Sequence, residues 1–184
     1  MVMKNELRKQ MHNQRRQVSS NDYQKAQDAI LATLLPLLTK IKSVAIYFAI
    51  NKELNLLKLI EYCINHNYLV CAPIAYHDNR IMRFEQIKEA TSRGLFYAKD
   101  YQLMNETKCY DLDLVFLPAV AIGKNGYRLG YGGGYYDATF AFNNPETILC
   151  AVGYDWQLID EVPYQDWDLR LDYFASEKQL LKLS

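Results

Sequence analysis

The sequence predicts an α/β fold: a single three-layer α/β/α domain over residues 1–184 with a mostly parallel, Rossmann-like sheet. Short apolar runs typical of buried strands alternate with amphipathic runs typical of helices along most of the chain. The chain has 184 residues, of which 50% are hydrophobic, so it is long enough to bury a full core. Because crossovers between parallel strands are right-handed, we expect helices on both faces of the sheet.

The first third of the chain predicts two helices, a strand and a third helix. Basic residues recur at i and i+4 within residues 3–17, which predicts a helix with one basic face, although such a face can be merely solvated. Ser20 is the expected N-cap of a second helix that runs to about Leu38 and is ended or kinked by Pro36. A buried strand is expected at 44–49 and an amphipathic helix at 54–65.

The rest of the chain repeats the alternation around a polar stretch. Residues 90–110 are polar and predict a loop. The expected elements are strands at 68–72 (closed by Pro73), 81–87, 112–120 and 147–153, and a helix at 135–142.

The charge balance excludes several classes of protein. Lys plus Arg and Asp plus Glu are each 21, so the chain is not a general binder of nucleic acid or of acidic membranes. No apolar run reaches the ~18 residues that a membrane span needs, and the polar N-terminus lacks the apolar core of a secretory signal. We expect a cytoplasmic monomer whose partners are small molecules.

The cysteines and histidines predict no metal centre. Cys63, Cys71, Cys109 and Cys150 lie in or beside apolar runs and form no C-x-x-C pair, so all four are expected to be free thiols. The three histidines share no spacing typical of zinc ligands.

Residues 128–137, Arg-Leu-Gly-Tyr-Gly-Gly-Gly-Tyr-Tyr-Asp, hold four of the eight glycines between a predicted strand and a predicted helix. Glycines let a ligand approach the backbone, and N–H groups at a helix start attract anions, so this stretch predicts a phosphate site. Arg128 can grip phosphate oxygens and Asp137 can hold Mg²⁺ against them. A tight turn would also explain the glycines, and neither the dinucleotide nor the P-loop pattern fits.

The pattern R-L-G-x-G-x-G-Y-Y-D resembles the signature of the 5-formyltetrahydrofolate cyclo-ligase family, also called methenyltetrahydrofolate synthetases. Residues 117–122 and 125–126 resemble its lead-in, residues 4–8 resemble its K-x-x-L-R opening, and residues 167–172 resemble its closing W-D-x-x-L-D. One position departs from the pattern: Gly133 stands where many members carry lysine.

The resemblance implies an ATP- and Mg²⁺-dependent ligase of one-carbon metabolism. In the family's chemistry the formyl oxygen of 5-formyltetrahydrofolate attacks the γ-phosphorus of ATP. N10 of the folate then displaces phosphate and closes the 5,10-methenyl bridge. ADP and phosphate are released.

The resemblance also implies site residues. Lys4, Arg8 and Arg128 are the expected catalytic cations, and Asp137 and Asp172 the expected Mg²⁺ ligands. Phe48 and Glu53 are expected to seat the folate together with Tyr131, Gly132, Gly133, Gly134 and Tyr135. The expected ATP-binding residues are Lys4, Asn5, Glu6, Leu7, Arg8, Arg128, Leu129, Gly130, Tyr131, Gly132, Gly133, Gly134, Tyr135 and Tyr136.

Several alternatives stay open at this point. The role of Glu53 can instead be limited to favouring the start of a helix through the helix dipole. Asp168 is interpreted as a turn residue, and the same interpretation stays open for Asp172. The chain can be a binder of folate or nucleotide without chemistry, as the missing lysine at 133 suggests. It can also be a kinase or ligase acting on another heterocycle.

Overall fold

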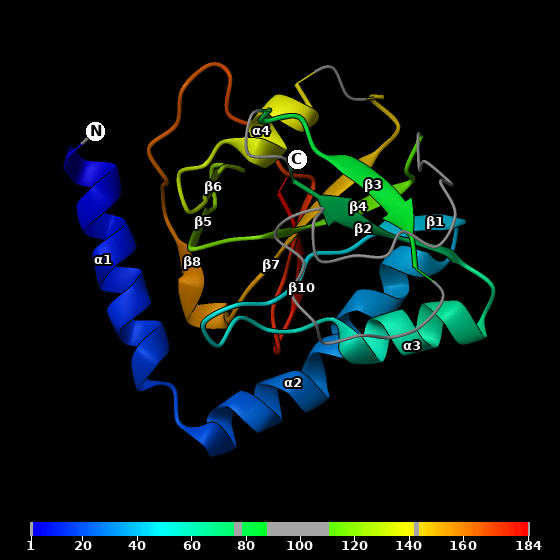
Figure 1. Cartoon of the computed structure of the whole chain (residues 1–184). Coiled ribbons are helices and arrows are strands. Elements are labelled where there is room, and N and C mark those ends of the chain that lie inside the picture. The colour runs from blue at the N-terminus through cyan, green and yellow to red at the C-terminus, as the bar shows by residue number, and fades with distance from the viewer. Residues whose placement is uncertain (1, 76–78, 88–110, 142–143, 184) are drawn as a thin grey trace.

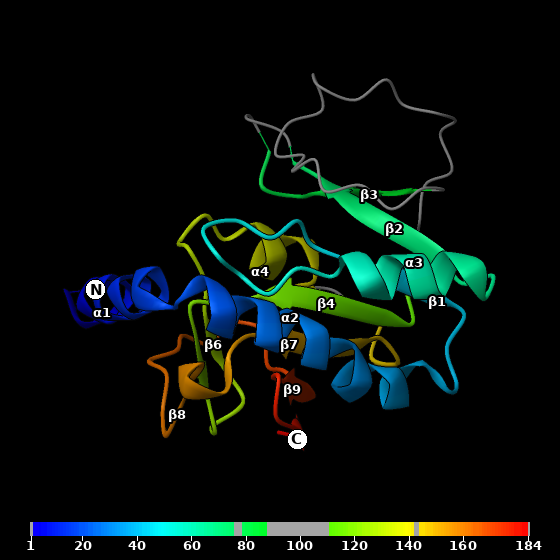
Figure 2. The ribbon, with the colours of Figure 1, turned by 90° about the horizontal axis from the view of Figure 1, so that it is seen from below.

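The computed structural model describes residues 2–75, 79–87, 111–141 and 144–183 (Figure 1). Within these residues, seven strands form the central sheet in the order β10-β9-β7-β4-β1-β2-β3. In Figure 2 the strands follow this order from β3 at the top to β9 at the bottom. The strands are β1 (Ser43–Ala45), β2 (Leu69–Ile74), β3 (Arg83–Gln86), β4 (Leu114–Pro118), β7 (Ile148–Val152), β9 (Tyr173–Ala175) and β10 (Leu180–Lys182).

The sheet is mostly parallel, as predicted. The pairs β1/β2, β1/β4, β4/β7 and β7/β9 are parallel, and only the outer pairs β2/β3 and β9/β10 are antiparallel. Side chains alternate between the two faces of each strand, so both faces of the central strands carry apolar residues. In β4, for example, Leu114 and Phe116 join one core cluster, whereas Val115 and Leu117 join another.

Each face of the sheet has its own cover. The helices α2 (Ser20–Leu34) and α3 (Leu57–Asn65) pack on one face, together with the 3-10 helix η1 (Leu35–Leu38), which directly follows α2. The opposite face is covered by the short helix α4 (Tyr135–Thr139) and by the chain around Leu171. Figure 1 shows α2 and α3 below the strands and α4 above them. The α/β fold class is confirmed, with only a short helix on the second face.

A second, three-stranded sheet was not predicted from the sequence. It has the order β6-β5-β8, with β5 at Ala121–Gly123, β6 at Arg128–Leu129 and β8 at Leu158–Ile159, after the 3-10 helix η3 (Asp155–Gln157). Met11 of helix α1 (Val2–Gln17) packs in one apolar cluster with Ala121 and Leu129 of this sheet. The small sheet therefore holds α1 beside the start of the glycine-rich stretch.

Some predicted boundaries were wrong. The N-cap of α2 is Ser19, not Ser20, because the Ser19 hydroxyl accepts the Asp22 N–H at 3.0 Å. Strand β2 continues through Pro73 to Ile74, because β1 pairs only with residues 69–71 and the missing N–H of Pro73 then faces no second strand. Helix α4 ends at Thr139 rather than 142, and the loop predicted at 90–110 lies outside the described residues.

The cysteine prediction was partly wrong. Cys63 and Cys150 are free and buried, and burial raises the pKa of the Cys63 thiol to about 12. Cys71, in contrast, is disulfide-bonded. Cys109 lies outside the described residues. None of the helices in the described part of the chain is long and apolar enough to cross a membrane.

Candidate active site

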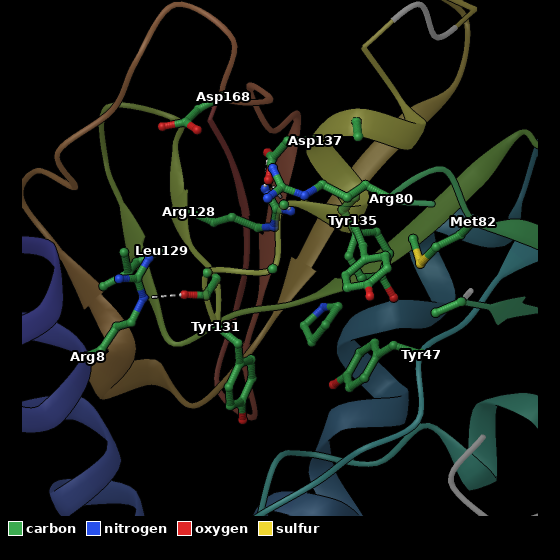
Figure 3. Close-up of a pocket in the computed structure, with 18 of the residues that line it drawn as sticks. Arg8, Tyr47, Arg80, Met82, Arg128, Leu129, Tyr131, Tyr135, Asp137 and Asp168 are labelled. Atoms are coloured by element: carbon green, nitrogen blue, oxygen red, sulfur yellow. Dashed lines mark hydrogen bonds and ion pairs between the residues drawn. The ribbon is translucent and has the colours of Figure 1, made fainter. Parts of the chain in front are cut away.

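A cavity of about 1140 Å³ lies beyond the carboxyl ends of β1, β2 and β4, the edge at which open α/β sheets bind ligands (Figure 3). Four separate parts of the chain line it: the start of α1, the loop between β1 and α3, the turn before β3, and the glycine-rich stretch. Ala138 and Ala141, residues 163–168, and the ends of β2 and β4 complete the wall.

Helix α1 brings two cations to the cavity. Lys4 Nζ forms an ion pair with Asp168 Oδ2 at 2.8 Å. Arg8 donates from Nε to the Gly130 carbonyl at 2.8 Å and from Nη1 to Asn5 Oδ1 at 2.7 Å. Arg8 thus contacts the glycine-rich stretch directly, from 122 residues away in the sequence.

Arg128 and Asp137 lie at the two ends of the glycine-rich stretch and form an ion pair. Arg128 Nη1 is 3.0 Å from Asp137 Oδ1, which also accepts the Leu169 N–H at 3.2 Å. Burial alone would raise the pKa of Asp137, but the charge and hydrogen bonds of Arg128 outweigh it and hold the pKa below its usual value. Among the described residues, nothing accepts a hydrogen bond from the buried Nε of Arg128.

Two glycines of this stretch have positive φ angles, which other residues rarely adopt. Gly132 has φ +102° and Gly134 has φ +70°, in the left-handed region. A side chain at Gly132 would also meet the Arg8 guanidinium, 3.5 Å from the position of a Cβ atom. Since α4 has only five residues, the backbone of the loop rather than the dipole of a long helix faces the cavity.

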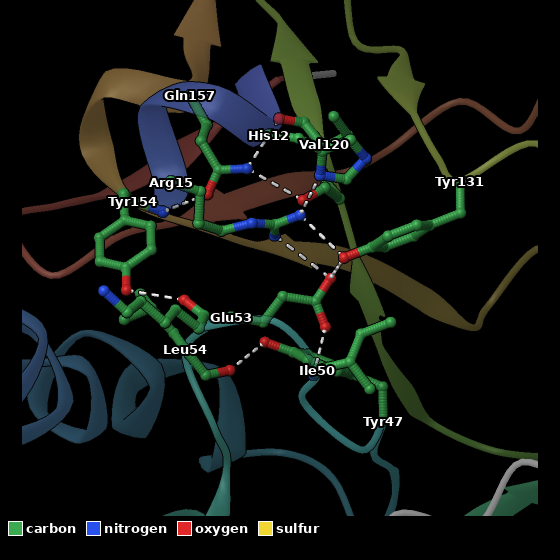
Figure 4. Close-up of polar contacts among 12 residues, drawn as sticks. His12, Arg15, Tyr47, Ile50, Glu53, Leu54, Val120, Tyr131, Tyr154 and Gln157 are labelled. Atoms are coloured by element: carbon green, nitrogen blue, oxygen red, sulfur yellow. Dashed lines mark hydrogen bonds and ion pairs between the residues drawn. The ribbon is translucent and has the colours of Figure 1, made fainter. Parts of the chain in front are cut away.

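A buried polar network supports Glu53 at the cavity wall (Figure 4). Glu53 Oε1 accepts from Tyr131 Oη at 2.8 Å and lies 3.3 Å from Arg15 Nη1, while Oε2 accepts the Ile50 N–H at 3.0 Å. Arg15 Nη2 also donates to Tyr131 Oη at 2.8 Å and to His12 Nδ1 at 3.1 Å. Arg15 and Glu53 are only 2% and 4% exposed, so each charge depends on the other.

The environment shifts the pKa values of this network. Burial raises the pKa of Glu53, and the Ile50 N–H and Arg15 only partly offset that rise. Burial, followed by the charges of Arg15, Arg16 and Arg8, lowers the pKa of His12. His12 is therefore neutral near pH 7 and can accept the hydrogen bond from Arg15.

The model of the 5-formyltetrahydrofolate cyclo-ligase family matches residues 1–177 of the chain. The chain belongs to this family. A 5-formyltetrahydrofolate cyclo-ligase of Mycoplasma genitalium is 29% identical over 177 residues, 94% of this chain and 96% of its own. That of Haemophilus influenzae is 29% identical over 137 residues, 71% of this chain and 73% of its own.

Solved structures of the family share the fold. The 5,10-methenyltetrahydrofolate synthetase of Mycoplasma pneumoniae superposes with a TM-score of 0.77 at 23% identity, covering 95% of this chain and 98% of the other. That of Aquifex aeolicus superposes with a TM-score of 0.79 at 24% identity, covering 98% and 93%. The predicted family resemblance and fold are confirmed.

Most of the site residues expected from the cyclo-ligase resemblance line the one cavity, although their roles stay predictions. Three of the expected ATP-binding residues do not line it. Glu6 is exposed, Asn5 contacts Arg8, and Leu7 packs against the small sheet. Those that line it are Lys4, Arg8, Phe48, Glu53, Arg128, Leu129, Gly130, Tyr131, Gly132, Gly133, Gly134, Tyr135, Tyr136 and Asp137.

Asp172 is not brought together with Asp137 in the cavity wall. Its Oδ2 accepts the Leu149 N–H at 2.8 Å, and its backbone N–H donates to the Leu149 carbonyl at 2.9 Å. These bonds tie the start of β9 to β7, which is a structural task. The alternative for Asp168, a turn, is present too, because its Oδ2 accepts the Gln165 N–H at 2.9 Å.

Four residues of the site region were not predicted from the sequence. Arg15 supports Glu53, and Arg80, Asp168 and Trp167 line the cavity. For Asp168 and Trp167 the closing W-D-x-x-L-D motif was a usable signal. Arg15 and Arg80 had none, because nothing local in the sequence shows which distant groups they face.

The described residues contain no group of three or more His, Cys, Asp and Glu side chains that could hold a metal ion. Asp137 nevertheless offers hard carboxylate oxygens at the cavity wall, and its Oδ2 has only a 3.5 Å contact with Arg128. Mg²⁺ commonly takes one or two carboxylates and completes its shell with phosphate and water. The residues present therefore fit a Mg²⁺ ion that is held largely by a bound triphosphate.

Proposed function

We propose that this chain converts 5-formyltetrahydrofolate and ATP to 5,10-methenyltetrahydrofolate, ADP and phosphate, with Mg²⁺. The observation that carries the proposal is a convergence in space. Lys4 and Arg8, from one end of the chain, line the same cavity as Arg128–Asp137, more than 100 residues later. Both segments lie within residues 1–177, which the model of the family matches.

The glycine-rich end of the cavity suits the triphosphate. Cations from two elements and the loop backbone surround it, and the buried Nε of Arg128 still needs an acceptor. Phosphoryl transfer depends mainly on positioning and on neutralising charge, which Lys4, Arg8 and Arg128 can supply without a protein nucleophile. Asp137 would hold Mg²⁺, which would supply positive charge to offset the negative charge of the phosphate groups.

The other end of the cavity suits a planar polar ring. Phe48 and Tyr135 offer apolar and aromatic surface, and Glu53 offers an acceptor already oriented by Tyr131 and Ile50. A carboxylate has about four acceptor positions, so Glu53 can still receive an N–H group of a pterin. For the reaction, the formyl group of a folate seated here would have to face the glycine-rich loop.

The chemistry then needs two displacements. The formyl oxygen attacks the γ-phosphorus and ADP leaves, so the oxygen becomes part of an imidate phosphate. N10 attacks the formyl carbon and loses its proton to solvent, the carbon–oxygen bond breaks, and phosphate leaves with that oxygen. Phosphorylation converts a poor leaving group, hydroxide, into a good one, which explains the need for ATP.

Trp167 gives the cavity an aromatic rim. Its side chain is 71% exposed although it lies in the cavity wall, next in sequence to Asp168, which pairs with Lys4. An exposed indole gains by stacking on a planar base. We assign it to the adenine of ATP, on the same side of the cavity as Lys4.

Three further predictions remain without a test: a single domain over residues 1–184, a cytoplasmic location, and a monomer that works without nucleic acid or membrane.

Isotope transfer tests the proposed route. With ¹⁸O in the formyl oxygen of the substrate, the proposal expects ¹⁸O in the released phosphate and one phosphate per methenyl group formed. Unlabelled phosphate would contradict it. ATP consumption without folate closure would indicate a ligase or kinase for another heterocycle, and folate binding without ATP consumption would indicate a binder.

A further inference from the structure

The cavity carries positive charge that no carboxylate of its wall compensates. The described residues contribute four cationic side chains to the wall: Lys4, Arg8, Arg80 and Arg128. Lys4 is paired with Asp168 and Arg128 with Asp137. The third acidic side chain of the wall, Glu53, is paired with Arg15 behind it. Arg8 and Arg80 remain as two uncompensated charges.

These two arginines differ in how they are held. Arg8 donates to two neutral oxygens, of Gly130 and Asn5. The Arg80 side chain has no hydrogen bond or ion pair with any residue that the structure describes, and it is exposed. A guanidinium has five N–H donors, so Arg80 lines the cavity with its full donor capacity unused.

The backbone around Arg80 is nevertheless held beside the loop. The Met82 N–H donates to Thr139 Oγ1 at 2.9 Å, and that hydroxyl donates to the Tyr135 carbonyl at 2.6 Å. The turn before β3 is thus fastened to α4, directly after the glycine-rich loop. As a result the Arg80 Nη1 atom lies 3.8 Å from where a Cβ of Gly134 would be.

The two arginines without a carboxylate partner flank the loop. The Arg8 guanidinium lies next to Gly132, and the Arg80 guanidinium next to Gly134. Figure 3 shows Arg80 reaching from the β3 side toward Arg128 and Asp137, with Arg8 on the other side of the loop. An anion seated on the loop backbone between these positions would meet both side chains.

We propose that Arg80 is a substrate-binding residue that grips the terminal phosphates of the nucleoside triphosphate. The inference rests on the proposed function and deepens it. A planar guanidinium can bind two phosphate oxygens at once, and a phosphate is the anion that the adjacent backbone N–H groups and Arg128 also favour.

Binding of the β,γ-imido analogue of ATP to Arg80→Gln provides the test. A charge-assisted hydrogen bond to a partly exposed group predicts a Kd about 10-fold higher than in the wild type. Arg80→Lys should recover part of that loss, and the Kd of AMP should not change. Arg83→Gln is the matched control, because Arg83 lies three residues further along, is exposed and does not line the cavity.

Steady-state kinetics shows which anion Arg80 binds: the triphosphate of ATP or the glutamate of the folate. The inference expects the KM for ATP to rise in Arg80→Gln while the KM for 5-formyltetrahydrofolate is kept. An unchanged Kd for the analogue, or a rise only in the KM for the folate, whose glutamate is also anionic, would overturn it. If the wild type binds the analogue through Arg80 but forms no methenyl product, the proposed function fails and the phosphate contact stands.

Discussion

The guanidinium of Arg128 lies 3.0 Å from the carboxylate of Asp137, so an ion pair closes the glycine-rich loop at its two ends. The same two side chains are those that the bound triphosphate would use, one for phosphate oxygens and one for Mg²⁺. The loop is therefore held in shape before the nucleotide arrives. Binding of Mg-ATP would replace the Arg128–Asp137 ion pair with two others, Arg128 with phosphate and Asp137 with Mg²⁺.

Replacing Arg128 should slow turnover without unfolding the protein. Arg128→Ala removes a cation that faces the transferring phosphate, and the loss of one such group lowers kcat by about 100-fold. The initial rate of methenyl formation measures the effect, and thermal melting checks the fold. Arg16→Ala, an exposed arginine of α1, is the control and should retain its rate. A normal rate in Arg128→Ala would remove Arg128 from the site.

The two predicted Mg²⁺ ligands should behave differently. Asp137→Asn weakens a hard oxygen ligand at the cavity, so the Mg²⁺ concentration for half-maximal rate should rise about 10-fold. Asp172→Asn keeps an oxygen that can accept the Leu149 N–H but removes the charge that strengthens this bond between β9 and β7, so it should lower the melting temperature slightly and leave the Mg²⁺ requirement unchanged. A raised Mg²⁺ requirement in a normally stable Asp172→Asn variant would restore Asp172 as a ligand.

Removing only one partner of the buried pair Arg15–Glu53 should be costly. Arg15→Met leaves the Glu53 carboxylate buried without its cation, which costs about 3–5 kcal/mol of unfolding free energy. The double variant Arg15→Met/Glu53→Gln should be more stable than Arg15→Met alone, because no unpaired charge remains. Urea unfolding of the wild type, the two single variants Arg15→Met and Glu53→Gln, and the double variant gives the coupling free energy between the two side chains. If the losses of the single variants simply add up in the double variant, the two side chains do not interact.

Acid should weaken the fold partly through His12. The folded-state pKa of His12 is lowered, so the unfolded chain binds the proton more readily and stability falls as the pH drops below the ordinary histidine value of about 6.5. The raised pKa of Glu53 acts in the opposite direction at lower pH. Urea unfolding between pH 7.5 and about 5.5 should therefore show a smaller pH effect in His12→Gln than in the wild type. If the free energy of unfolding changed equally with pH in both proteins, His12 would not contribute to the acid sensitivity.

Trp167 should report the nucleotide. Because its indole is exposed and lies at the rim, stacking on adenine should change its fluorescence when ATP is added. The same change should disappear in Trp167→Phe, in which Trp156 is the remaining tryptophan. A change that persists in Trp167→Phe would place the base elsewhere.

How far the sequence could predict this molecule depended on how local each signal was. The alternating apolar runs were enough to predict the parallel sheet, because strand burial leaves a pattern within a few residues. The R-L-G-x-G-x-G-Y-Y-D stretch was enough to predict the loop. The small sheet β6-β5-β8 was missed, because two of its strands have only two residues and leave no periodicity.

The partners of charged side chains were harder still to predict. Arg15 appeared to be part of a basic helix face, yet the fold buries it against Glu53, 38 residues away. Asp172 carried the right motif for a metal ligand, yet its register beside Leu149 uses its carboxylate in the sheet. Such pairings are set by tertiary packing, which no spacing in the sequence records.

The most direct measurement is the near-ultraviolet absorbance of 5,10-methenyltetrahydrofolate, followed in purified protein mixed with 5-formyltetrahydrofolate, with and without Mg-ATP. The account predicts that the band grows only when Mg-ATP is present, at a rate proportional to the protein concentration. No growth of the band with Mg-ATP, while both ligands bind, would contradict the proposed cyclo-ligase activity.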